Sequence, residues 1–330
     1  QEMRSLSGSL LNTVRIGQWE FHRIGLMDLP LYTDYIKATA YPANLWSASF
    51  AYLWAASRSR LRQILWRIVD GLLVTFGYSY KKTLYLFCLP FGAAGPRELA
   101  EVVLKCLHYC YEQNDWDYRR TLVRMINGSQ LEFLQRYSGF DQAFRLATLQ
   151  GIERHLAVAK VAALAGKEFA TVRNKANKFR RENPGVVVRR AQQDDYDALV
   201  ELGRDWDSTA GRKYRRIFDR TYYREMISHS EELDQIILVV EKSGQIIGMV
   251  SGGILPTGQA WGGLLKYAGG MPGLSETLAV AFARELNRIN PGVALLNIGS
   301  DLGPGGLREY KLKFRPVLNL KRYQMYLKKR

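Results

Sequence analysis

A glycine-rich turn near the C-terminus is flanked by groups that could carry out acid–base and anion-binding chemistry. The apolar run 293–298 predicts a strand, followed by Asp301, several glycines and a short basic helix with Arg308 and Lys311 one turn apart. Carboxylates and phosphate-binding groups gather at the carboxyl ends of strands in α/β folds, because the loops there are exposed. Asp301 could therefore act on a bound ligand, or it could cap the helix while the glycines turn the chain.

A second segment, residues 167–190, combines a basic composition with a helical pattern. Its apolar residues recur every three to four positions and so share one helix face: Phe169, Val172, Ala176 and Phe179. Another face carries arginine and asparagine: Arg173, Asn177 and Arg180 or Arg181. Because a guanidinium donates in a planar fork, this helix can pack by one side and contact phosphate groups by the other.

The net charge is concentrated in the same two places. The chain has 330 residues, with 47 Lys and Arg against 31 Asp and Glu, which gives +16. Residues 167–190 hold eight basic and two acidic side chains, and residues 308–330 hold nine and one. A third cluster of four arginines lies at 58–67. Each run alone could be a solvated face, but together they indicate an anionic partner: nucleic acid, an acidic membrane surface or phosphorylated ligands.

The rest of the sequence argues against several classes of protein. With 47% apolar residues the chain can bury a core, which excludes global disorder. Three cysteines cannot form a disulfide framework and fit a reducing compartment. No apolar run reaches the ~18 residues that span a bilayer. No export signal is evident, and Gln1 in place of an initiator methionine leaves open whether residues precede it.

Common cofactor and metal motifs are missing from the sequence. It contains no phosphate loop ending in Gly-Lys-Ser/Thr and no dinucleotide fingerprint after a predicted strand. The four histidines are scattered without metal-ligand spacing, so no metal site is predicted. Cys106 and Cys110, one turn apart on an apolar helix face, are expected to be buried thiols.

The periodicities predict two α/β halves of similar order. In the first half, strands are expected at 19–24, 65–76, 82–89 and 121–126, with Gly77 near the central turn, and helices at 29–39 and from Pro96. In the second half, strands are expected at 186–190, 235–241, 245–255, 259–267, 293–298 and 323–327, and helices at 194–206, 274–289 and 307–314. We therefore predict two mixed α/β domains, 1–140 and 182–330, joined by helices within 141–181.

Two blocks of the second half resemble a known family. The first is Gly166-Lys167-Glu168-Phe169 with Arg173-Asn174-Lys175 and Asn177-Lys178-Phe179, followed by Trp206. The second runs from Asn297 through Asp301-Leu302-Gly303, Gly306-Leu307-Arg308, Lys311 and Phe314-Arg315-Pro316 to Tyr323. Together they resemble the C-terminal cytosolic domain of phosphatidylglycerol lysyltransferases, the multiple peptide resistance factors. The resemblance implies two tandem acetyltransferase-like (GNAT) domains, with the probable active site in the second.

The resemblance also implies an activity, partners and a location. The family transfers an aminoacyl group from aminoacyl-tRNA, which is the donor substrate, and needs no further cofactor. The acceptor is the headgroup of phosphatidylglycerol in the full-length bacterial enzymes, whose membrane-spanning flippase is missing from this sequence. The acceptor here is therefore either that anionic phospholipid or a small molecule. The implied location is cytoplasmic, with peripheral contact at the inner face of the membrane.

The resemblance to this family implies a role for each candidate residue. Asp301 would orient or deprotonate the acceptor hydroxyl, while Arg308 and Lys311 would hold a phosphate or stabilise the oxyanion. Trp206 would stack on a terminal base or lie in the core. The remaining candidates would contact the tRNA end or a phosphate: Arg173, Lys175, Asn177, Lys313 and Arg315.

Two other functions compete with aminoacyl transfer. Acetyltransferases hold the pyrophosphate of acetyl-CoA on a glycine-rich turn that opens a helix after the central strand. The equivalent place here, Lys266 to Leu274, is glycine-rich but lacks the motif, and Pro272 removes an amide that such a loop would donate. An RNA- or membrane-binding module on an inactive acetyltransferase fold is the non-enzymatic alternative.

Overall fold

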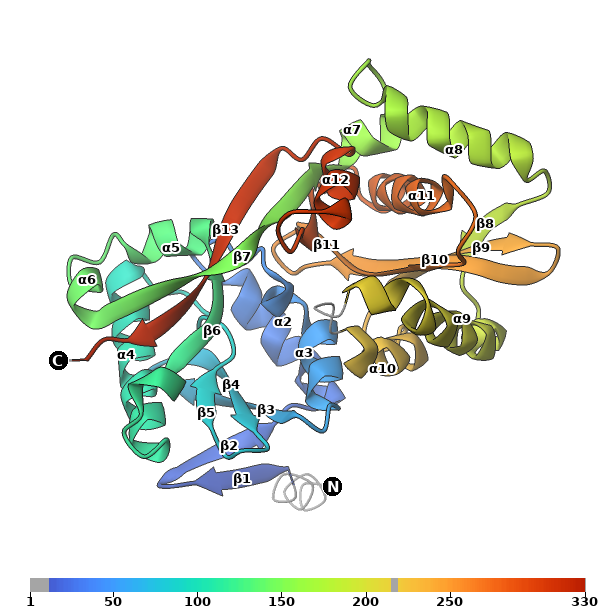
Figure 1. The fold of residues 1–330 in the computed structure, drawn as a ribbon. Coiled ribbons are helices and arrows are strands. Elements are labelled where there is room, and N and C mark those ends of the chain that lie inside the picture. The colour runs from blue at the N-terminus through green and yellow to red at the C-terminus, as the bar shows by residue number, and fades with distance from the viewer. Residues whose placement is uncertain (1–11, 215–218, 330) are drawn as a thin grey trace. The chain divides into compact units, whose positions relative to one another are not determined.

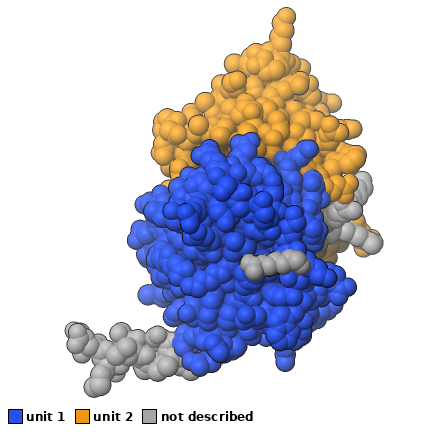
Figure 2. Space-filling view, turned by 90° about the vertical axis from the view of Figure 1, so that its left-hand side faces the viewer, with its two compact units in different colours: residues 1–43, 56–149, 321–330 blue, residues 44–55, 150–320 orange. Residues whose placement is uncertain are grey.

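The computed structural model describes residues 12–214 and 219–329, and within them the chain forms two compact units. Unit 1 comprises residues 1–43, 56–149 and 321–330, and unit 2 comprises residues 44–55 and 150–320 (Figure 2). The division differs from the predicted domains at two places. Residues 44–55, expected in the first domain, belong to unit 2, and residues 321–330, expected in the second, belong to unit 1.

Unit 1 is a mixed sheet with helices. Its strands follow the order β1-β2-β3-β4-β5-β6, with β13 beside β6, and all neighbours are antiparallel except β5 and β6. The strands are β1 (Thr13–Ile16), β2 (Trp19–Arg23), β3 (Arg62–Val69), β4 (Leu72–Ser79), β5 (Leu84–Leu86) and β6 (Leu122–Asn127). The helices are α2 (Leu29–Lys37), α4 (Pro96–Gln113), α5 (Gly128–Leu134) and α6 (Phe140–Ala143).

The strands of unit 2 follow the order β7-β12-β11-β10-β9-β8, and all neighbours are antiparallel except β11 and β12. Its strands are β8 (Val187–Arg190), β9 (Ile236–Lys242), β10 (Gln245–Ile254), β11 (Ala260–Tyr267) and β12 (Leu295–Ser300). Its helices are α3 (Phe50–Ser57), α7 (Val158–Ala163), α8 (Ala170–Glu182), α9 (Tyr196–Ser208), α10 (Tyr223–Ser228), α11 (Leu274–Ile289) and α12 (Gly306–Leu312). Two long strands, β7 (Phe144–Ala157) and β13 (Leu318–Leu327), run from one unit into the other.

Helices cover both faces of the unit 2 sheet. α8, α11 and α12 lie on one face, and α9 and α10 lie on the other (Figure 1). The parallel pairing of β11 with β12 involves two residue pairs, Ala260 with Leu296 and Trp261 with Asn297. The crossover between these two strands is α11, so the start of α11 and the end of β12 are available to build a site.

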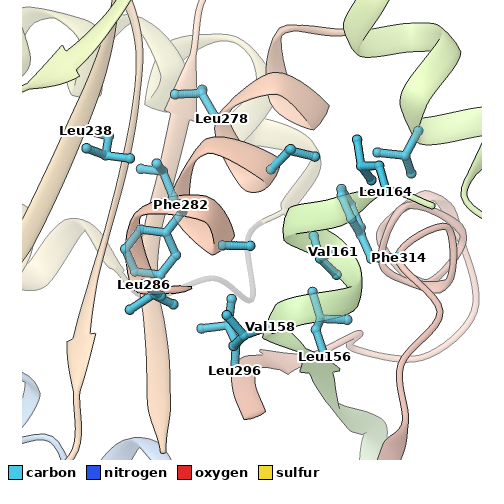
Figure 3. Packing of buried hydrophobic residues seen from close by; sticks show 14 of the residues in the cluster. Leu156, Val158, Val161, Leu164, Leu238, Leu278, Phe282, Leu286, Leu296 and Phe314 are labelled. Carbon is cyan, nitrogen blue, oxygen red and sulfur yellow. The ribbon is translucent and has the colours of Figure 1, made fainter. Parts of the chain in front are cut away.

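The core of unit 2 is organised by α11. Its apolar residues recur every four positions, and Leu274, Leu278, Phe282 and Leu286 are all buried, as the periodicity predicts. They pack against α7 and the sheet, with Val161 and Leu238 among their neighbours (Figure 3). Ile289, predicted on the same face, is 41% exposed because it is the last residue of the helix.

Two sequence predictions fail for identifiable reasons. The strand predicted at 65–76 is instead a hairpin of β3 and β4, which turns at Asp70 and Gly71, both with positive φ. Gly77, placed near a turn, lies inside β4. Within 141–181, where joining helices were expected, the first half is the strand β7. Its residues include good helix formers such as Leu, Ala, Gln and Glu, so local preference gives no sign of the tertiary pairing that decides its state.

Candidate functional site

Asp301 lies directly after β12 and is 2% exposed. Its Oδ2 accepts from Nη2 and Nε of Arg154 at 2.6 and 3.0 Å, and its Oδ1 accepts from the amides of Ile152 and Gly303 at 2.9 and 3.0 Å. Burial alone would raise the pKa of this carboxyl, but the two amides and Arg154 outweigh it and lower the pKa below its usual value. Asp301 is therefore an ionised carboxylate whose oxygens are all engaged.

These contacts give Asp301 a different role from the one the sequence suggested. A base needs an oxygen that can receive a proton from the substrate, and a lowered pKa weakens that ability. The network instead ties the loop after β12 to β7. We therefore treat Asp301 as a positioning residue, and its predicted role as proton acceptor is not favoured by this geometry.

The loop after β12 is also held by close backbone packing. Gly151 of β7 has φ +89°, and a Cβ there would lie 2.5 Å from Oγ of Ser300 and 2.7 Å from the amide nitrogen of Leu302. A side chain at this position would push β7 away from the loop. The glycine thus permits the contact that brings Arg154 to Asp301.

Helix α12 follows this loop and carries the other two predicted catalytic residues. Nζ of Lys311 donates to the carbonyl oxygens of Ile298 and Ser300 at 2.6 and 2.7 Å, which fastens α12 to the end of β12. Arg308 is exposed and forms no hydrogen bond or ion pair with any residue in the described ranges. Of the three predicted residues, Arg308 is therefore the one whose charge can meet a ligand.

The first turn of α11 is filled by a carboxylate of the protein itself. Glu276 is 3% exposed, and its Oε1 lies 3.3 Å from Nζ of Lys313 and 3.4 Å from Nζ of Lys175. Ser275 Oγ donates to its Oε2 at 3.0 Å. Burial raises the pKa of Glu276, but its own amide, Ser275 and the two lysines together lower it. Lys175 and Lys313, both predicted to bind substrate, thus share an internal partner.

Arg173 and Arg315 hold the turn between α7 and α8. Nη1 of Arg173 donates to the carbonyl oxygens of Leu164 and Gly166 at 2.5 and 3.0 Å. Nε of Arg315 donates to the carbonyl oxygen of Glu168 at 3.0 Å. These two arginines therefore donate hydrogen bonds to backbone carbonyl oxygens. The sequence analysis predicts that they contact the tRNA end or a substrate phosphate.

The predicted two-sided character of α8 is confirmed. Its apolar residues Val172, Ala176 and Phe179 are buried, and Phe169 just before it is buried as well. The outer face carries exposed polar and basic side chains: Lys175, Asn177, Lys178, Arg180 and Arg181. The outer face of α8 therefore presents four basic side chains and one amide to solvent.

Trp206 lies on the opposite face of the sheet from these residues. It belongs to α9, is 7% exposed, and its ring lies 3.6 Å from Nζ of Lys266. The structure therefore places it in the core, the alternative left open by the sequence, and separates it from α8, α11 and α12.

Lys266 of β11 was missed as a site residue. It is 1% exposed, and its Nζ lies 2.8 Å from Oδ2 of Asp219 and 3.9 Å from Oδ1 of Asp207. Burying an ammonium is costly unless it is paired, so the two carboxylates and the Trp206 ring compensate for its desolvation. The signal for it in the sequence is a lysine inside the otherwise apolar strand β11.

An open pocket of about 550 Å³ adjoins this buried cluster. We call it the arginine pocket, and its lining residues are Arg204, Asp207, Ser208, Arg212 and Arg220. Asp207 belongs both to the pocket wall and to the surroundings of Lys266. The pocket therefore has guanidinium groups in its wall and the buried Lys266 cluster next to it.

Comparisons with known proteins agree with this architecture. The family model described as phosphatidylglycerol lysyltransferase, C-terminal, matches residues 45–326. No curated protein sequence matches the chain. Among the part of the chain that the structure describes, no helix combines the length and apolar character needed to cross a bilayer.

Three solved structures illustrate the similarity in fold. A conserved protein of unknown function from Bacteroides thetaiotaomicron has a TM-score of 0.80 at 20% identity, over 93% of this chain and 99% of that one. L-PGS from Bacillus licheniformis has a TM-score of 0.64 at 17% identity, and the match covers 91% of this chain and 92% of that one. A tandem GNAT protein from the clavulanic acid biosynthesis pathway has a TM-score of 0.51 at 11% identity, and the match covers 92% of this chain and 97% of that one. At these identities the likeness concerns the fold, which is mixed α/β and GNAT-like.

Proposed function

The chain belongs to the family of phosphatidylglycerol lysyltransferase C-terminal domains, and on that premise we propose that it transfers an aminoacyl group from aminoacyl-tRNA to the headgroup hydroxyl of phosphatidylglycerol. The observation that carries the proposal is the family match over residues 45–326, which includes nearly all of unit 2. The GNAT-like fold of its neighbours fits acyl transfer in general. The amino acid and the tRNA donor are the parts that need an experiment.

The reaction requires little from the protein beyond positioning and charge. The aminoacyl ester is already activated, so the acceptor oxygen attacks its carbonyl carbon and forms the new ester bond. The bond from that carbon to the ribose oxygen breaks, and the ribose oxygen ends with the proton that the acceptor hydroxyl loses. Positive charge near the carbonyl oxygen lowers the barrier. Arg308, exposed on α12, is our candidate for this charge or for a substrate phosphate.

The residues around α12 would act by holding it in place. Lys311 ties α12 to the end of β12, and Arg154 with Asp301 ties the following loop to β7. An arginine on a seven-residue helix contributes to catalysis only if the helix has a fixed position. Asp301 and Lys311 are therefore proposed as positioning residues for Arg308.

The exposed face of α8 supplies a surface for the tRNA. Asn177, Lys178, Arg180 and Arg181 can contact successive phosphates of an RNA backbone, and Lys175 is half exposed beside them. The same charge would favour contact with an anionic leaflet, which is where phosphatidylglycerol is presented. Peripheral association with the inner face of the membrane is part of this proposal.

The closed first turn of α11 supports an aminoacyl donor over acetyl-CoA. In GNAT enzymes this helix start receives the pyrophosphate, but here the Glu276 carboxylate occupies it between Lys175 and Lys313. A Cβ at Gly273 would lie only 2.3 Å from the carbonyl oxygen of Lys175, so the α8 backbone packs directly on this turn. A pyrophosphate would meet a like charge and a neighbouring helix.

The two units support a tandem arrangement of GNAT-like halves. Each contains an antiparallel hairpin next to a parallel strand pair: β3, β4, β5 and β6 in unit 1, and β9, β10, β11 and β12 in unit 2. In each unit a long helix, α4 or α11, connects the parallel pair. We propose that they are two copies of one fold, with the reaction confined to unit 2.

A transfer assay tests the proposed reaction. The protein is mixed with radiolabelled total aminoacyl-tRNA and phosphatidylglycerol vesicles, and the label is followed into the lipid phase. We expect label in lipid, and the labelled amino acid identifies the donor. Label that leaves tRNA only when small-molecule extracts are added would replace the lipid by a soluble acceptor. No loss of label from any tRNA would contradict the proposal.

A further inference from the structure

One end of the β3–β4 hairpin in unit 1, opposite its turn at Asp70 and Gly71, carries a surface that the proposed reaction does not use. Two short segments form it, residues 58–62 and 79–83, and they hold five basic side chains and no acidic one. We call this surface the hairpin patch, and we propose that it docks on an anionic membrane surface by charge attraction and shallow insertion of its apolar side chains. The inference rests on the peripheral association in the proposed function and gives it a surface in unit 1, whereas the reaction is placed in unit 2.

Backbone hydrogen bonds bring the two segments of the patch together. Arg62 of β3 pairs with Ser79 of β4, at the end of the hairpin ladder. Beyond this pair, the amide of Tyr80 donates to the carbonyl oxygen of Leu61 at 3.1 Å. The turn after β4 is closed by Ser79, whose Oγ accepts from the amide of Thr83 at 3.1 Å. The patch is therefore preformed and needs no folding step when it meets a partner.

Two large apolar side chains of the patch are exposed next to each other. Leu61 is 47% exposed and Tyr80 is 67% exposed. Single exposed apolar residues are common on protein surfaces and need no explanation. An aliphatic and an aromatic neighbour within a wholly basic surface are instead typical of interfacial proteins. Such proteins insert apolar groups at the headgroup level, while Lys and Arg remain in the aqueous layer.

The charge of the patch is available to an external anion. Arg60, Lys81 and Lys82 are exposed, and none of them forms an ion pair within the part of the chain that the structure describes. The ammonium of Lys81 lies 5.6 Å from the ring centroid of Tyr80, so charge and ring lie on the same side of the turn. Near an anionic leaflet, each such basic group raises the partition coefficient about fivefold.

Lys82 occupies a backbone position that other residue types suit better. Its φ is +58°, in the left-handed region that glycine and asparagine tolerate best. Its amide donates to the carbonyl oxygen of Ser79 at 2.9 Å, as in a tight turn. A lysine here does not benefit the backbone, so we attribute its presence to the charge that it adds to the patch. Replacing it by asparagine removes the charge without straining the turn.

A nucleic acid would be attracted by the same charge, but it would not use the apolar side chains. The outer groups of an RNA helix are phosphates and hydroxylated sugars, which offer no partner for an exposed leucine. A membrane offers anionic headgroups to the basic residues and acyl chains beneath them to Leu61 and the Tyr80 ring. The combination of charge and apolar surface therefore favours the membrane.

Flotation of the full chain with vesicles tests the docking without tRNA. The vesicles contain phosphatidylcholine and phosphatidylserine at about three to one, because phosphatidylserine is anionic but has no headgroup hydroxyl to accept an ester. We expect the wild-type chain to float with these vesicles and not with phosphatidylcholine alone. Lys81→Gln/Lys82→Asn should lower the partition coefficient about tenfold or more. The control Arg97→Gln/Arg288→Gln removes two exposed guanidinium groups outside the patch and should change it less than twofold.

A second variant separates a membrane from a nucleic acid as the partner. Leu61→Ser/Tyr80→Ser keeps every charge and changes only exposed side chains, so it should fold like wild type. We expect it to lower vesicle binding about tenfold, because apolar area is no longer buried in the leaflet. Its binding to deacylated tRNA in a filter assay should stay within about twofold of wild type. Leu61→Ser alone, with a smaller loss, serves if the double variant does not fold.

Three results would overturn the inference. They are a wild-type chain that does not float with the anionic vesicles, a control pair that loses as much binding as the lysine pair, and vesicle binding that the serine variant leaves intact. A lysine pair that loses binding to tRNA alone would assign the patch to RNA instead. A chain that docks through the patch but transfers no label would count against the proposed reaction and leave the docking standing.

Discussion

The Arg154 guanidinium lies 2.6 Å from the Asp301 carboxylate, across 147 positions of sequence, and the pair fixes the loop between β12 and α12 to β7. Both side chains are nearly inaccessible to solvent. Removing one partner of a buried ion pair leaves an uncompensated charge. Together with Lys311, which fastens α12 to the end of β12, the pair therefore fixes the position of the helix that carries Arg308.

Replacing Asp301 by alanine should destabilise the protein by about 3 kcal/mol, because Arg154 would remain buried without its partner. Urea denaturation measures the change in the free energy of unfolding. Glu101→Ala, which removes an exposed i,i+4 partner of Arg97, is the control and should cost about 0.5 kcal/mol or less. Equal costs for the two variants would mean that the Arg154–Asp301 pair does not hold the loop.

Stability should fall at acid pH through the carboxylates with lowered pKa values. Hydrogen bonds from Arg288 and Arg190 lower the pKa of Glu285 to about 2, although partial burial opposes them. A depressed pKa in the folded state contributes stability that is present above about pH 4.5 and is lost as pH falls towards 2. We expect Glu285→Gln to remove on the order of 2 kcal/mol at pH 7 and much less at pH 2. A loss that is the same at both pH values would contradict this.

Gly151 and Gly258 form a matched pair with nearly the same positive φ. Their φ values are +89° and +87°, but a Cβ at Gly151 would collide with Ser300 and Leu302, while one at Gly258 meets nothing within 4 Å. Gly258→Ala should cost about 1 kcal/mol of backbone strain. Gly151→Ala should cost about 3 kcal/mol and slow transfer as well. Similar melting temperatures and rates would remove the argument for close packing at β7.

Removing the carboxylate of Glu276 should open an anion site at the start of α11. Lys175 and Lys313 would lose their shared partner, and the helix start would offer amides and two ammonium groups to phosphate. Phosphate should then raise the melting temperature of Glu276→Ala more than that of wild type, since a ligand that binds the folded state stabilises it. Thermal melts at several phosphate concentrations, with potassium chloride matched for ionic strength, measure this. Identical phosphate responses would show that Glu276 does not fill the site.

Much of unit 2 could be predicted from sequence because its signals are local. The four-residue spacing from Leu274 to Leu286 specifies α11, and the turn at Ser243 and Gly244 specifies the hairpin of β9 and β10. The composition of the β12–α12 segment also singles out Asp301 and Lys311, but it predicts catalytic roles for them, whereas the structure shows Asp301 bonded to Arg154 and Lys311 bonded to the carbonyl oxygens of Ile298 and Ser300. Their partners could not be predicted, because the contact of Arg154 with Asp301 depends on tertiary packing.

The unpredicted features share this dependence on long-range contacts. Residues 44–55 join unit 2, where the Asn297 side chain donates to the Asn44 carbonyl at 2.8 Å across 253 positions. The Lys266 cluster is assembled from α9, β11 and Asp219, which are far apart in sequence. No periodicity or short motif encodes such long-range contacts. The sequence alone therefore could not decide whether Trp206 lies in the core or on the surface.

The most direct test of the central claim is the single-turnover rate at which Arg308→Ala moves label from aminoacyl-tRNA to phosphatidylglycerol vesicles. Arg308 is exposed and has no partner in the described ranges, so its loss should leave the melting temperature unchanged. The rate should fall about a hundredfold, while Arg97→Ala, an exposed arginine of unit 1, should react like wild type. An Arg308→Ala protein that transfers at the wild-type rate would contradict the placement of the reaction at α12.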